Sequence, residues 1–265
     1  MSNIDSTARI APGALLGKDL TIGPYCVVGP SVTIGDGCQL LSHVHLAGRT
    51  TIGARTKISA FASLGTPPQS VHYHGEDTTL TIGADCDIRE HVTINIATPE
   101  GSGTRIGDRC MLMVGSHVGH DCVIGNDVVF ANNATLGGFV EIGDHVFLGG
   151  LCAIHQFVRI GEHAMIGGMT GVNHDVIPYG IVIGNRGRLA GLNRIGLKRR
   201  GFSSADLQAI NKGYRSIFFG DGTLAERVAR AAEEHPDNPH VMRMITFIRA
   251  GKRRLTLARA EEESE

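Results

Sequence analysis

Aliphatic or Phe residues recur at every sixth position through most of the chain, and the phase of this pattern never shifts. Gly directly follows fifteen of these twenty-five positions. A period of six matches neither the turn of an α-helix nor the alternation of a long strand, so it indicates a repeat architecture. The positions are Ile10, Leu16, Ile22, Val28, Ile34, Leu40, Leu46, Ile52, Ile58, Leu64, Ile82, Ile88, Ile94, Ile106, Leu112, Val118, Ile124, Phe130, Leu136, Ile142, Leu148, Ile154, Ile160, Ile166 and Val172.

This period is typical of the flat sides of a parallel β-helix, in which three hexads make one coil. Between residues 10 and 172 the spacing predicts nine coils. Each coil would bury its apolar column against the next, so stability would be nearly one-dimensional. A residue would then stack on the residue 18 positions further along the chain.

Two segments interrupt the pattern without losing its phase, residues 66–80 and 96–104. Both are rich in Pro or Gly, and we interpret them as loops that project from the β-helix. Long loops on a rigid scaffold often carry function.

The repeat ends near Pro178, and helical spacing follows. The sequence therefore predicts a β-helical domain over residues 1–185, and a linker with a C-terminal α-helical domain over residues 186–265. The tail, Glu261–Glu265, is expected to be frayed.

We predict helices over residues 203–219, 223–235 and 239–254. Ser203 or Ser204 can cap the first helix. Thr223 followed by Glu226 resembles a capping box for the second.

The composition fits a folded domain with a sizeable core. The chain has 265 residues, of which 42% are hydrophobic, and a formal net charge of −1. This balance does not favour a nucleic-acid partner. No apolar run is long enough for a membrane span, and the N-terminus lacks a secretory signal, so we expect a cytoplasmic protein.

The cysteines all fall four residues after a position of the apolar phase. Other members of that column are small, such as Ala14, Thr56 and Ala62. We therefore interpret the cysteines as small buried hydrophobic residues in a reducing compartment, since no CxxC pair supports a zinc ribbon. They are Cys26, Cys38, Cys86, Cys110, Cys122 and Cys152.

One stack of the repeat combines residues that can carry chemistry. His120 would stack on Gly138 and Gln156, and Asp121 would lie beside His120. A His held by a carboxylate is a plausible general base. An exposed N–H at Gly138 would be able to stabilise an oxyanion.

Two alternatives for this stack stay open. The first is a ladder of surface histidines on a solvated face, as for His145 and His163, which are also 18 apart. The second is a zinc site, in which His117 and His120 would join a third His. A zinc site of that kind needs three converging imidazoles, and the spacing offers no clear third.

Residues 184–202 hold six cationic side chains and no acidic one. Such a basic stretch suits phosphate oxygens or an acidic protein partner. The alternative is a solvated linker.

Several motifs occur in an order that resembles a known family. They are the hexapeptide repeat and the segments His117–Cys122, Ala131–Leu136, His155–Phe157 and Gly196–Phe202. Together they resemble the acyl-[acyl-carrier-protein]–UDP-N-acetylglucosamine O-acyltransferases, which catalyse the first step of lipid A synthesis. The resemblance covers nearly the whole chain. It implies a left-handed parallel β-helix and a homotrimer with active sites between neighbouring subunits.

The resemblance also implies a mechanism. His120 would be the general base that removes the proton of the glucosamine 3-hydroxyl as this oxygen attacks the acyl thioester. Asp121 would orient His120, and the N–H of Gly138 would hold the thioester oxyanion. No covalent intermediate, metal or cofactor is implied.

The remaining site residues come from the same resemblance. His72, His117, His155 and Gln156 would line the sugar and acyl groove. Gly168 matches the position that limits acyl length in the family, and a Gly there would leave the groove open for a longer chain. Asn193, Arg199 and Arg200 would contact the nucleotide, and the basic stretch would attract acyl carrier protein.

The sequence departs from the family pattern at a few positions. Phe139 stands where many members have His, and Ile195 where some have Glu. Ser70 and His72 stand where members commonly have an acidic residue and Lys. These last two leave open whether the acceptor is UDP-N-acetylglucosamine or its 3-amino analogue.

Other functions remain as alternatives. The related N-acyltransferases carry a uridine-binding domain before their repeats, whereas here the repeat starts at residue 10. A small-molecule acetyltransferase that uses acetyl-CoA is another enzyme alternative. A non-enzymatic β-helix scaffold predicts that His120 can be replaced without consequence.

Overall fold

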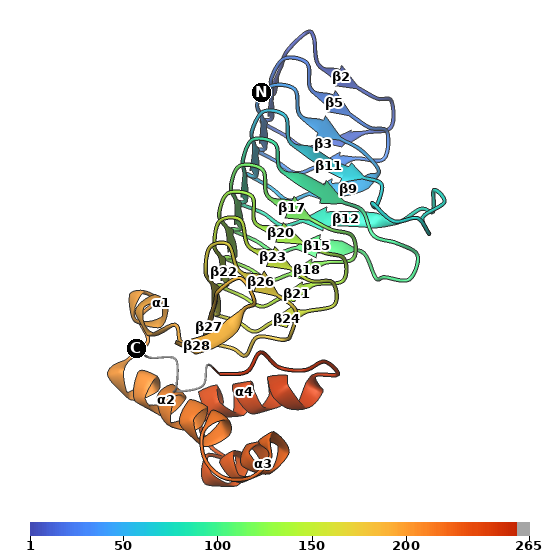
Figure 1. Cartoon of the computed structure of the whole chain (residues 1–265). Coiled ribbons are helices and arrows are strands. Elements are labelled where there is room, and N and C mark those ends of the chain that lie inside the picture. The colour runs from blue at the N-terminus through green and yellow to red at the C-terminus, as the bar shows by residue number, and fades with distance from the viewer. Residues whose placement is uncertain (259–265) are drawn as a thin grey trace.

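The computed structural model describes residues 1–258, which form a long prism of short strands followed by four helices (Figure 1). The chain moves from one flat side of the prism to the next about every six residues, so consecutive strands belong to three different sheets. Within each sheet, strands of the successive coils pair in parallel. The predicted parallel β-helix with C-terminal helices is confirmed.

The three sides of the prism contain 11, 9 and 8 strands. The first sheet consists of β1 (Asn3–Ile4), β4 (Thr21–Ile22), β7 (Gln39–Leu40), β10 (Lys57–Ile58), β13 (Asp87–Ile88), β16 (Met111–Leu112), β19 (Val129–Phe130), β22 (Phe147–Leu148), β25 (Met165–Ile166), β27 (Gly180–Ile183) and β28 (Arg188–Leu192). The second consists of β2 (Arg9–Ile10), β5 (Val27–Val28), β8 (His45–Leu46), β11 (Ser63–Thr66), β14 (Thr93–Asn95), β17 (His117–Val118), β20 (Thr135–Leu136), β23 (Ala153–Ile154) and β26 (Gly171–Val172). The third consists of β3 (Leu15–Leu16), β6 (Thr33–Ile34), β9 (Arg49–Ile52), β12 (Thr79–Ile82), β15 (Thr104–Ile106), β18 (Val123–Ile124), β21 (Glu141–Ile142) and β24 (Arg159–Ile160).

A two-residue strand in the middle of the prism turns its first residue outward and buries its second. In β20, for example, Thr135 is exposed and Leu136 is buried. The buried residues are those of the six-residue phase, and they form one continuous core along the prism. The period of the sequence is therefore the period of the sheets, because each side of the prism takes one hexad.

The predicted number of nine coils is wrong by one. The second sheet runs from β2 to β26 in nine strands, which are joined by eight steps. Most steps advance the chain by 18 residues, but Ile52 pairs with Ile82, and Ile94 pairs with Val118. The segments between β11 and β12 and between β14 and β15 take up the additional residues, and both project from the prism (Figure 1).

The end of the prism is closed by a hairpin and four helices. Strand β28 pairs antiparallel with β27, and the predicted domain boundary at residue 185 falls in the turn between them. The helices are α1 (Arg194–Arg199), α2 (Ser204–Phe218), α3 (Leu224–Glu234) and α4 (Pro239–Ala250).

The predicted helix caps are present, but two details differ from the prediction. Ser203 caps α2, and Thr223 and Glu226 form the capping box of α3. Helix α4 ends at Ala250 instead of residue 254, because the chain turns extended at Gly251 and its later backbone bonds to the prism. Helix α1 was not predicted; its N-cap is Asn193.

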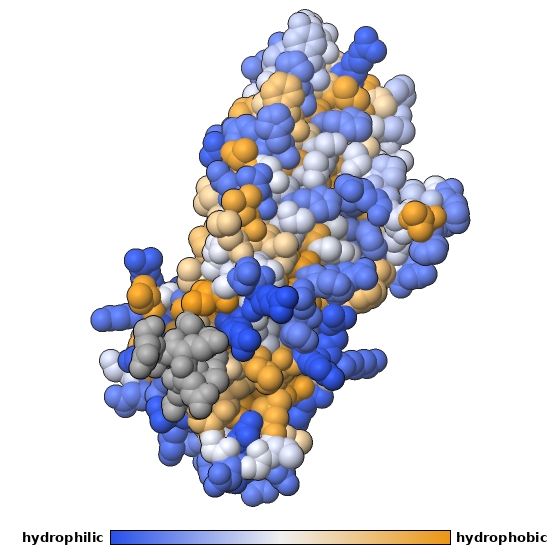
Figure 2. Space-filling model, viewed as in Figure 1, coloured by the Kyte–Doolittle hydropathy of each residue, from blue (hydrophilic) through white to orange (hydrophobic). Residues whose placement is uncertain are grey.

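An aromatic cluster joins the helices to the last coils. Tyr179 is fully buried, and its ring stacks on His163 and meets Phe202 edge-on. The Tyr179 hydroxyl donates to Glu162 over 3.2 Å, and Arg243 of α4 donates to this hydroxyl over 3.3 Å. Strongly hydrophilic residues also gather where the prism meets the helices (Figure 2). The packing fixes α4 against the last coils.

All six cysteines are buried and unpaired, as predicted. The expected fraying of Glu261–Glu265 lies outside the described residues. None of the helices within residues 1–258 has the length and apolar character needed to cross a bilayer.

Candidate functional site

His120 and Asp121 form a hydrogen-bonded pair at a corner of the prism. They lie in the turn between β17 and β18, where Asp121 takes a left-handed conformation with φ of 62°. Nδ1 of His120 lies 2.7 Å from Oδ2 of Asp121. Because an ionised carboxylate only accepts hydrogen bonds, Nδ1 carries the proton and Nε2 is left as the basic nitrogen.

The two side chains differ in exposure. The side chain of His120 is 17% exposed, whereas that of Asp121 is 1% exposed. The imidazole can therefore meet a ligand, while the carboxylate is shielded from water and acts on the ligand only through His120.

Gly138 lies against the imidazole on the next coil. A β-carbon at this position would lie 2.6 Å from Nε2 of His120, so no larger residue fits beside the ring as it stands. Within residues 1–258, the N–H of Gly138 donates to no backbone carbonyl. The structure thus brings together His120, Asp121 and Gly138, with a base and an unused N–H donor side by side.

Asp121 is also held by the segment between β14 and β15. Thr98 donates to Oδ2 of Asp121 through its backbone N–H at 3.0 Å and its hydroxyl at 2.8 Å. The N–H of Asp121 donates to Oγ1 of Thr104 over 2.8 Å. Sequence reasoning missed both threonines. Thr98 lies in the aperiodic segment between β14 and β15, where the rule of stacking 18 residues apart does not apply, and Thr104 is the first residue of β15.

His117 lies on β17, one strand before the corner. Its Nδ1 is 2.8 Å from the hydroxyl of Thr93, which pairs with it on the preceding coil. Burial lowers the pKa of His117, and the nearby His120 lowers it further. His117 is therefore a neutral hydrogen-bonding group at neutral pH.

Two Phe side chains continue the corner below Asp121. Phe139 meets the ring of His120 edge-on at 5.3 Å and stacks on Phe157 at 4.7 Å. Together with Asp121, they line a groove with a volume of 630 Å³, and Lys252 and Arg253 lie in its wall. The lining of the groove thus combines aromatic rings with cations, and also includes Glu100 and Glu141.

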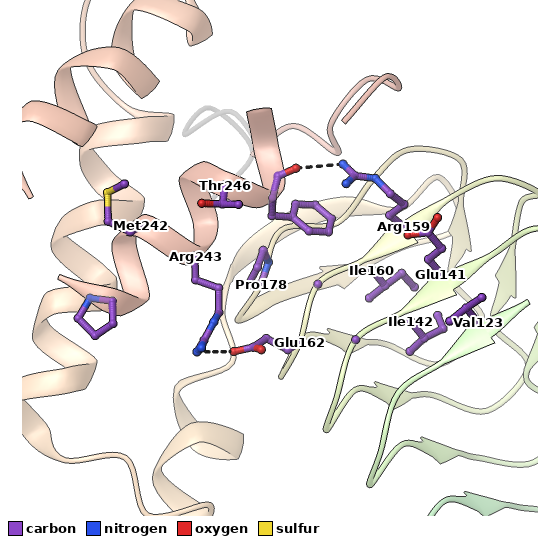
Figure 3. A pocket seen from close by; sticks show the side chains of 14 residues that line it. Val123, Glu141, Ile142, Arg159, Ile160, Glu162, Pro178, Met242, Arg243 and Thr246 are labelled. Carbon is purple, nitrogen blue, oxygen red and sulfur yellow. Dashed lines mark hydrogen bonds and ion pairs between the residues drawn. The ribbon is translucent and has the colours of Figure 1, made fainter. Parts of the chain in front are cut away.

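A second groove of 570 Å³ shares Val123, Glu141 and Arg159 with the first (Figure 3). It lies between the third sheet and α4. Arg159 donates to the carbonyl of Phe247 over 3.0 Å, and Arg243 pairs with Glu162 over 2.8 Å. These contacts connect the third sheet to α4 and hold the two walls of the groove together.

The other predicted groove residues are spread over the surface. His155 and Gln156 are exposed at the same corner one coil beyond Gly138, and Nδ1 of His155 is 3.0 Å from the carbonyl of Gln156. His72 is exposed in the projecting segment between β11 and β12. Gly168 is exposed at a different corner, and a β-carbon there would meet only Gly150.

Asn193, Arg199 and Arg200 lie away from His120 in this chain. They line a pocket of 700 Å³ with Phe147 and Met165 of the first sheet, whereas His120 lies between the second and third sheets. Asn193 is buried; its side chain donates to the carbonyl of His163 and accepts from Gly196. One chain therefore does not assemble the predicted nucleotide residues with the predicted base.

The histidines do not form a metal cluster in the described structure. His145 and His163 stack at 4.7 Å, and burial lowers the pKa of His163 to about 4. Across residues 1–258, no three His, Cys, Asp or Glu side chains converge in an arrangement that suits a metal ion.

Two family models match the chain. One, described as UDP-N-acetylglucosamine O-acyltransferase, domain 2, matches residues 175–256. The other, bacterial transferase hexapeptide (six repeats), matches residues 103–138.

Similar proteins span almost the whole chain. An acyl-[acyl-carrier-protein]–UDP-N-acetylglucosamine O-acyltransferase of Azorhizobium caulinodans is 58% identical over 95% of this chain and 93% of its own length. The protein of the same name in Caulobacter vibrioides is 51% identical over 95% of this chain and 96% of its own length.

The chain belongs to the UDP-N-acetylglucosamine O-acyltransferase family. The solved UDP-N-acetylglucosamine acyltransferase of Campylobacter jejuni, 36% identical, superposes with a TM-score of 0.92 and covers 97% of this chain and 100% of its own. That of Francisella novicida, 32% identical, gives a TM-score of 0.94 over 99% and 96% of the two chains. The protein is therefore an acyltransferase, and its coils wind in the left-handed sense of this UDP-N-acetylglucosamine O-acyltransferase family.

Proposed function

We propose that this enzyme transfers a 3-hydroxyacyl group from acyl carrier protein to the 3-hydroxyl of UDP-N-acetylglucosamine, the first step of lipid A synthesis. The names of the similar proteins support the donor and the acceptor. The observation that carries the mechanism is the imidazole of His120, which is held by Asp121 at 2.7 Å and lies against Gly138.

The reaction needs one base and one oxyanion donor. Nε2 of His120 removes the proton of the acceptor hydroxyl as its oxygen attacks the thioester carbonyl carbon. The N–H of Gly138 stabilises the carbonyl oxygen as it becomes negative. When the C–S bond breaks, the imidazolium returns the proton to the leaving thiolate, so His120 ends as it began.

The other residues are assigned to binding. His72, His117, His155 and Gln156 line the sugar and acyl groove. Gly168 stands at the position that sets acyl length, and its lack of a side chain leaves the groove open for a longer chain. As a neutral group, His117 can offer a hydrogen bond to an uncharged sugar or acyl hydroxyl without attracting an anion. The reaction requires no metal or cofactor.

We propose that the enzyme acts as a homotrimer. Asn193, Arg199 and Arg200 lie on a different side of the prism from His120. A neighbouring copy in a cyclic assembly is able to bring these three residues to His120 of the first copy. The active site would then lie between subunits, with phosphates bound to the neighbour's Arg side chains.

Charge supports acyl carrier protein as the partner. The stretch 184–202 carries six cations, and Lys252 and Arg253 lie in the groove wall below Asp121. An acidic carrier would be attracted to this end of the molecule. We also propose a cytoplasmic location, which suits six buried cysteines that remain unpaired.

The test is mass spectrometry of the products formed from UDP-N-acetylglucosamine and a panel of 3-hydroxyacyl carrier proteins. Acylated UDP-N-acetylglucosamine is expected with the wild-type protein and is lost in His120→Ala. The matched control, His43→Ala, removes an exposed histidine from another corner and should retain the product.

The 3-amino sugar analogue, run in parallel, tests the second candidate. Ser70 and His72, in the projecting segment, are the residues that favour it. An amide product from the analogue alone would replace the proposed acceptor. No product with either acceptor would contradict the proposal and favour a non-enzymatic scaffold.

A further inference from the structure

The carboxylate of Asp121 receives more hydrogen bonds than its contact with His120 requires. Oδ2 accepts from Nδ1 of His120 and from both the N–H and the hydroxyl of Thr98. All three donors converge on one oxygen. Oδ1 is buried and has no hydrogen-bond partner within residues 1–258. The carboxylate is therefore held in one orientation by donors on a single side.

The segment between β14 and β15, which contains Thr98, and Thr104 at the start of β15 also shape the space around Asp121. The N–H of Asp121 donates to the hydroxyl of Thr104, which holds the left-handed backbone of the corner. The N–H of Gly101 donates to the carbonyl of Thr98 over 3.2 Å, and a β-carbon at Gly101 would overlap Oδ1 of Asp121. The segment thus closes over the carboxylate and leaves room for it only because residue 101 lacks a side chain.

We propose that Thr98 is a positioning residue for the transfer reaction, and that the segment between β14 and β15 belongs to the catalytic machinery. This inference rests on the proposed function of His120. Both hydrogen bonds of Thr98 in this site go to Asp121 and not to the imidazole. It fixes the direction of Oδ2, and Oδ2 fixes the tautomer and orientation of His120.

The physical reason is the buried negative charge. A carboxylate that is 1% exposed needs donors in place of water, and charge-assisted hydrogen bonds are about twice as strong as neutral ones. With Thr98 in place, Oδ2 already points at Nδ1 before the imidazole becomes charged. The site then does not have to reorganise when His120 takes the proton.

The test uses three variants of the full-length protein. Thr98→Val keeps the shape of the side chain and removes the hydroxyl, and Thr98→Ser keeps the hydroxyl. Thr50→Val is the matched control, because Thr50 is also buried and its hydroxyl donates to the carbonyl of Ala47 over 2.7 Å.

We expect Thr98→Val to lower kcat about tenfold or more, which is the range for a lost hydrogen bond to a charged group. The KM values for both substrates should stay within about twofold, since Thr98 is buried and its hydroxyl is bound to Asp121. Thr98→Ser and Thr50→Val should retain most of the wild-type kcat. Wild-type kcat in Thr98→Val, or an equal loss in Thr98→Ser, would overturn the proposal.

A second readout does not depend on turnover. Nitrogen-15 NMR of the imidazole of His120 reports which ring nitrogen carries the proton. The wild-type protein should show the Nδ1–H tautomer, and Thr98→Val should show a mixture. An unchanged tautomer would reject positioning by Thr98 even if the wild-type protein proved inactive as an acyltransferase, so the two proposals fail separately.

Discussion

Gly138 leaves the space in which the imidazole of His120 lies: a β-carbon on Gly138 would come within 2.6 Å of Nε2. The two residues belong to successive coils, so the parallel stacking of the prism makes this contact. The pairing of Val118 with Leu136 sets its register. If the imidazole had to move away from Gly138, its Nε2 would also move away from the Gly138 N–H that we assign to the oxyanion.

Gly138→Ala is therefore predicted to inactivate the enzyme while leaving it folded. The added methyl would displace the imidazole, and a misplaced base loses its contribution of about 10²–10⁴-fold. Steady-state kinetics and thermal unfolding measure the two effects. Gly150→Ala is the matched control, because its β-carbon would meet only a carbonyl at 3.4 Å. Activity above a tenth of wild type in Gly138→Ala would argue against the assigned geometry.

Asp121→Asn should keep the shape of the corner and lower kcat on the order of 10²-fold. The amide removes the negative charge that stabilises the imidazolium of His120 as it forms. Because Asp121 is shielded from the ligand, KM should change little. Steady-state kinetics in which the concentrations of both substrates are varied will measure kcat and KM separately. A rise in KM at unchanged kcat would indicate that Asp121 binds substrate instead.

His163 should make the fold sensitive to acid. Burial, assisted by the nearby His145, lowers its pKa to about 4, against an ordinary value of 6.5. The unfolded chain therefore binds a proton below pH 6.5 that the folded chain refuses. The contribution of the neutral His163 to the free energy of unfolding is therefore fully present above pH 6.5. It is lost as the pH falls from 6.5 toward 4.

His163→Phe removes the titrating imidazole and keeps an aromatic ring in the cluster with Tyr179 and Phe202. We expect the difference in Tm between pH 7 and pH 4.5 to be smaller in the variant than in wild type. Thermal unfolding at a series of pH values is the measurement. An equal decrease of Tm between pH 7 and pH 4.5 in both proteins would show that groups other than His163 cause the acid sensitivity.

The cysteines should be inert in the folded protein. Burial raises the pKa of Cys122 and of Cys152 to about 12, and all six are buried. A thiol reagent at pH 8 is expected to label none of them in native protein and all of them in denaturant, because burial keeps the reagent from every thiol. At Cys122 and Cys152 the reactive thiolate is also scarce. Rapid native labelling of Cys122 or Cys152 would show that the coils open locally.

The sequence predicts the prism well because its signal is periodic. Each hexad makes one side, so the positions of His120, Asp121 and Gly138 relative to one another follow from counting. Counting fails where the chain leaves the prism, and the predicted number of coils was therefore one too many. Thr98 reaches Asp121 from such a segment, and nothing in its composition indicates that contact.

The helical end was predicted from local chemistry with partial success. Capping residues placed the starts of α2 and α3, since their hydrogen bonds are local. The end of α4 depends on backbone bonds between the prism and the segment after Gly251, so helical spacing alone overestimated its length. Arg199 of α1 and its neighbours Asn193 and Arg200 lie on a different side of the prism from His120. The spacing of residues along the sequence does not show which residues of two different chains meet.

The antiparallel pairing of β28 with β27 has a consequence for solubility. A stack of parallel strands ends in an open row of N–H and C=O groups, which can template the addition of another chain. Strand β28 occupies that row on the first sheet, and the helices cover the last coils beside it (Figure 1). A protein cut before β28 would present the same strands with a free edge, and fibrous end-to-end growth would compete with its folding into discrete particles.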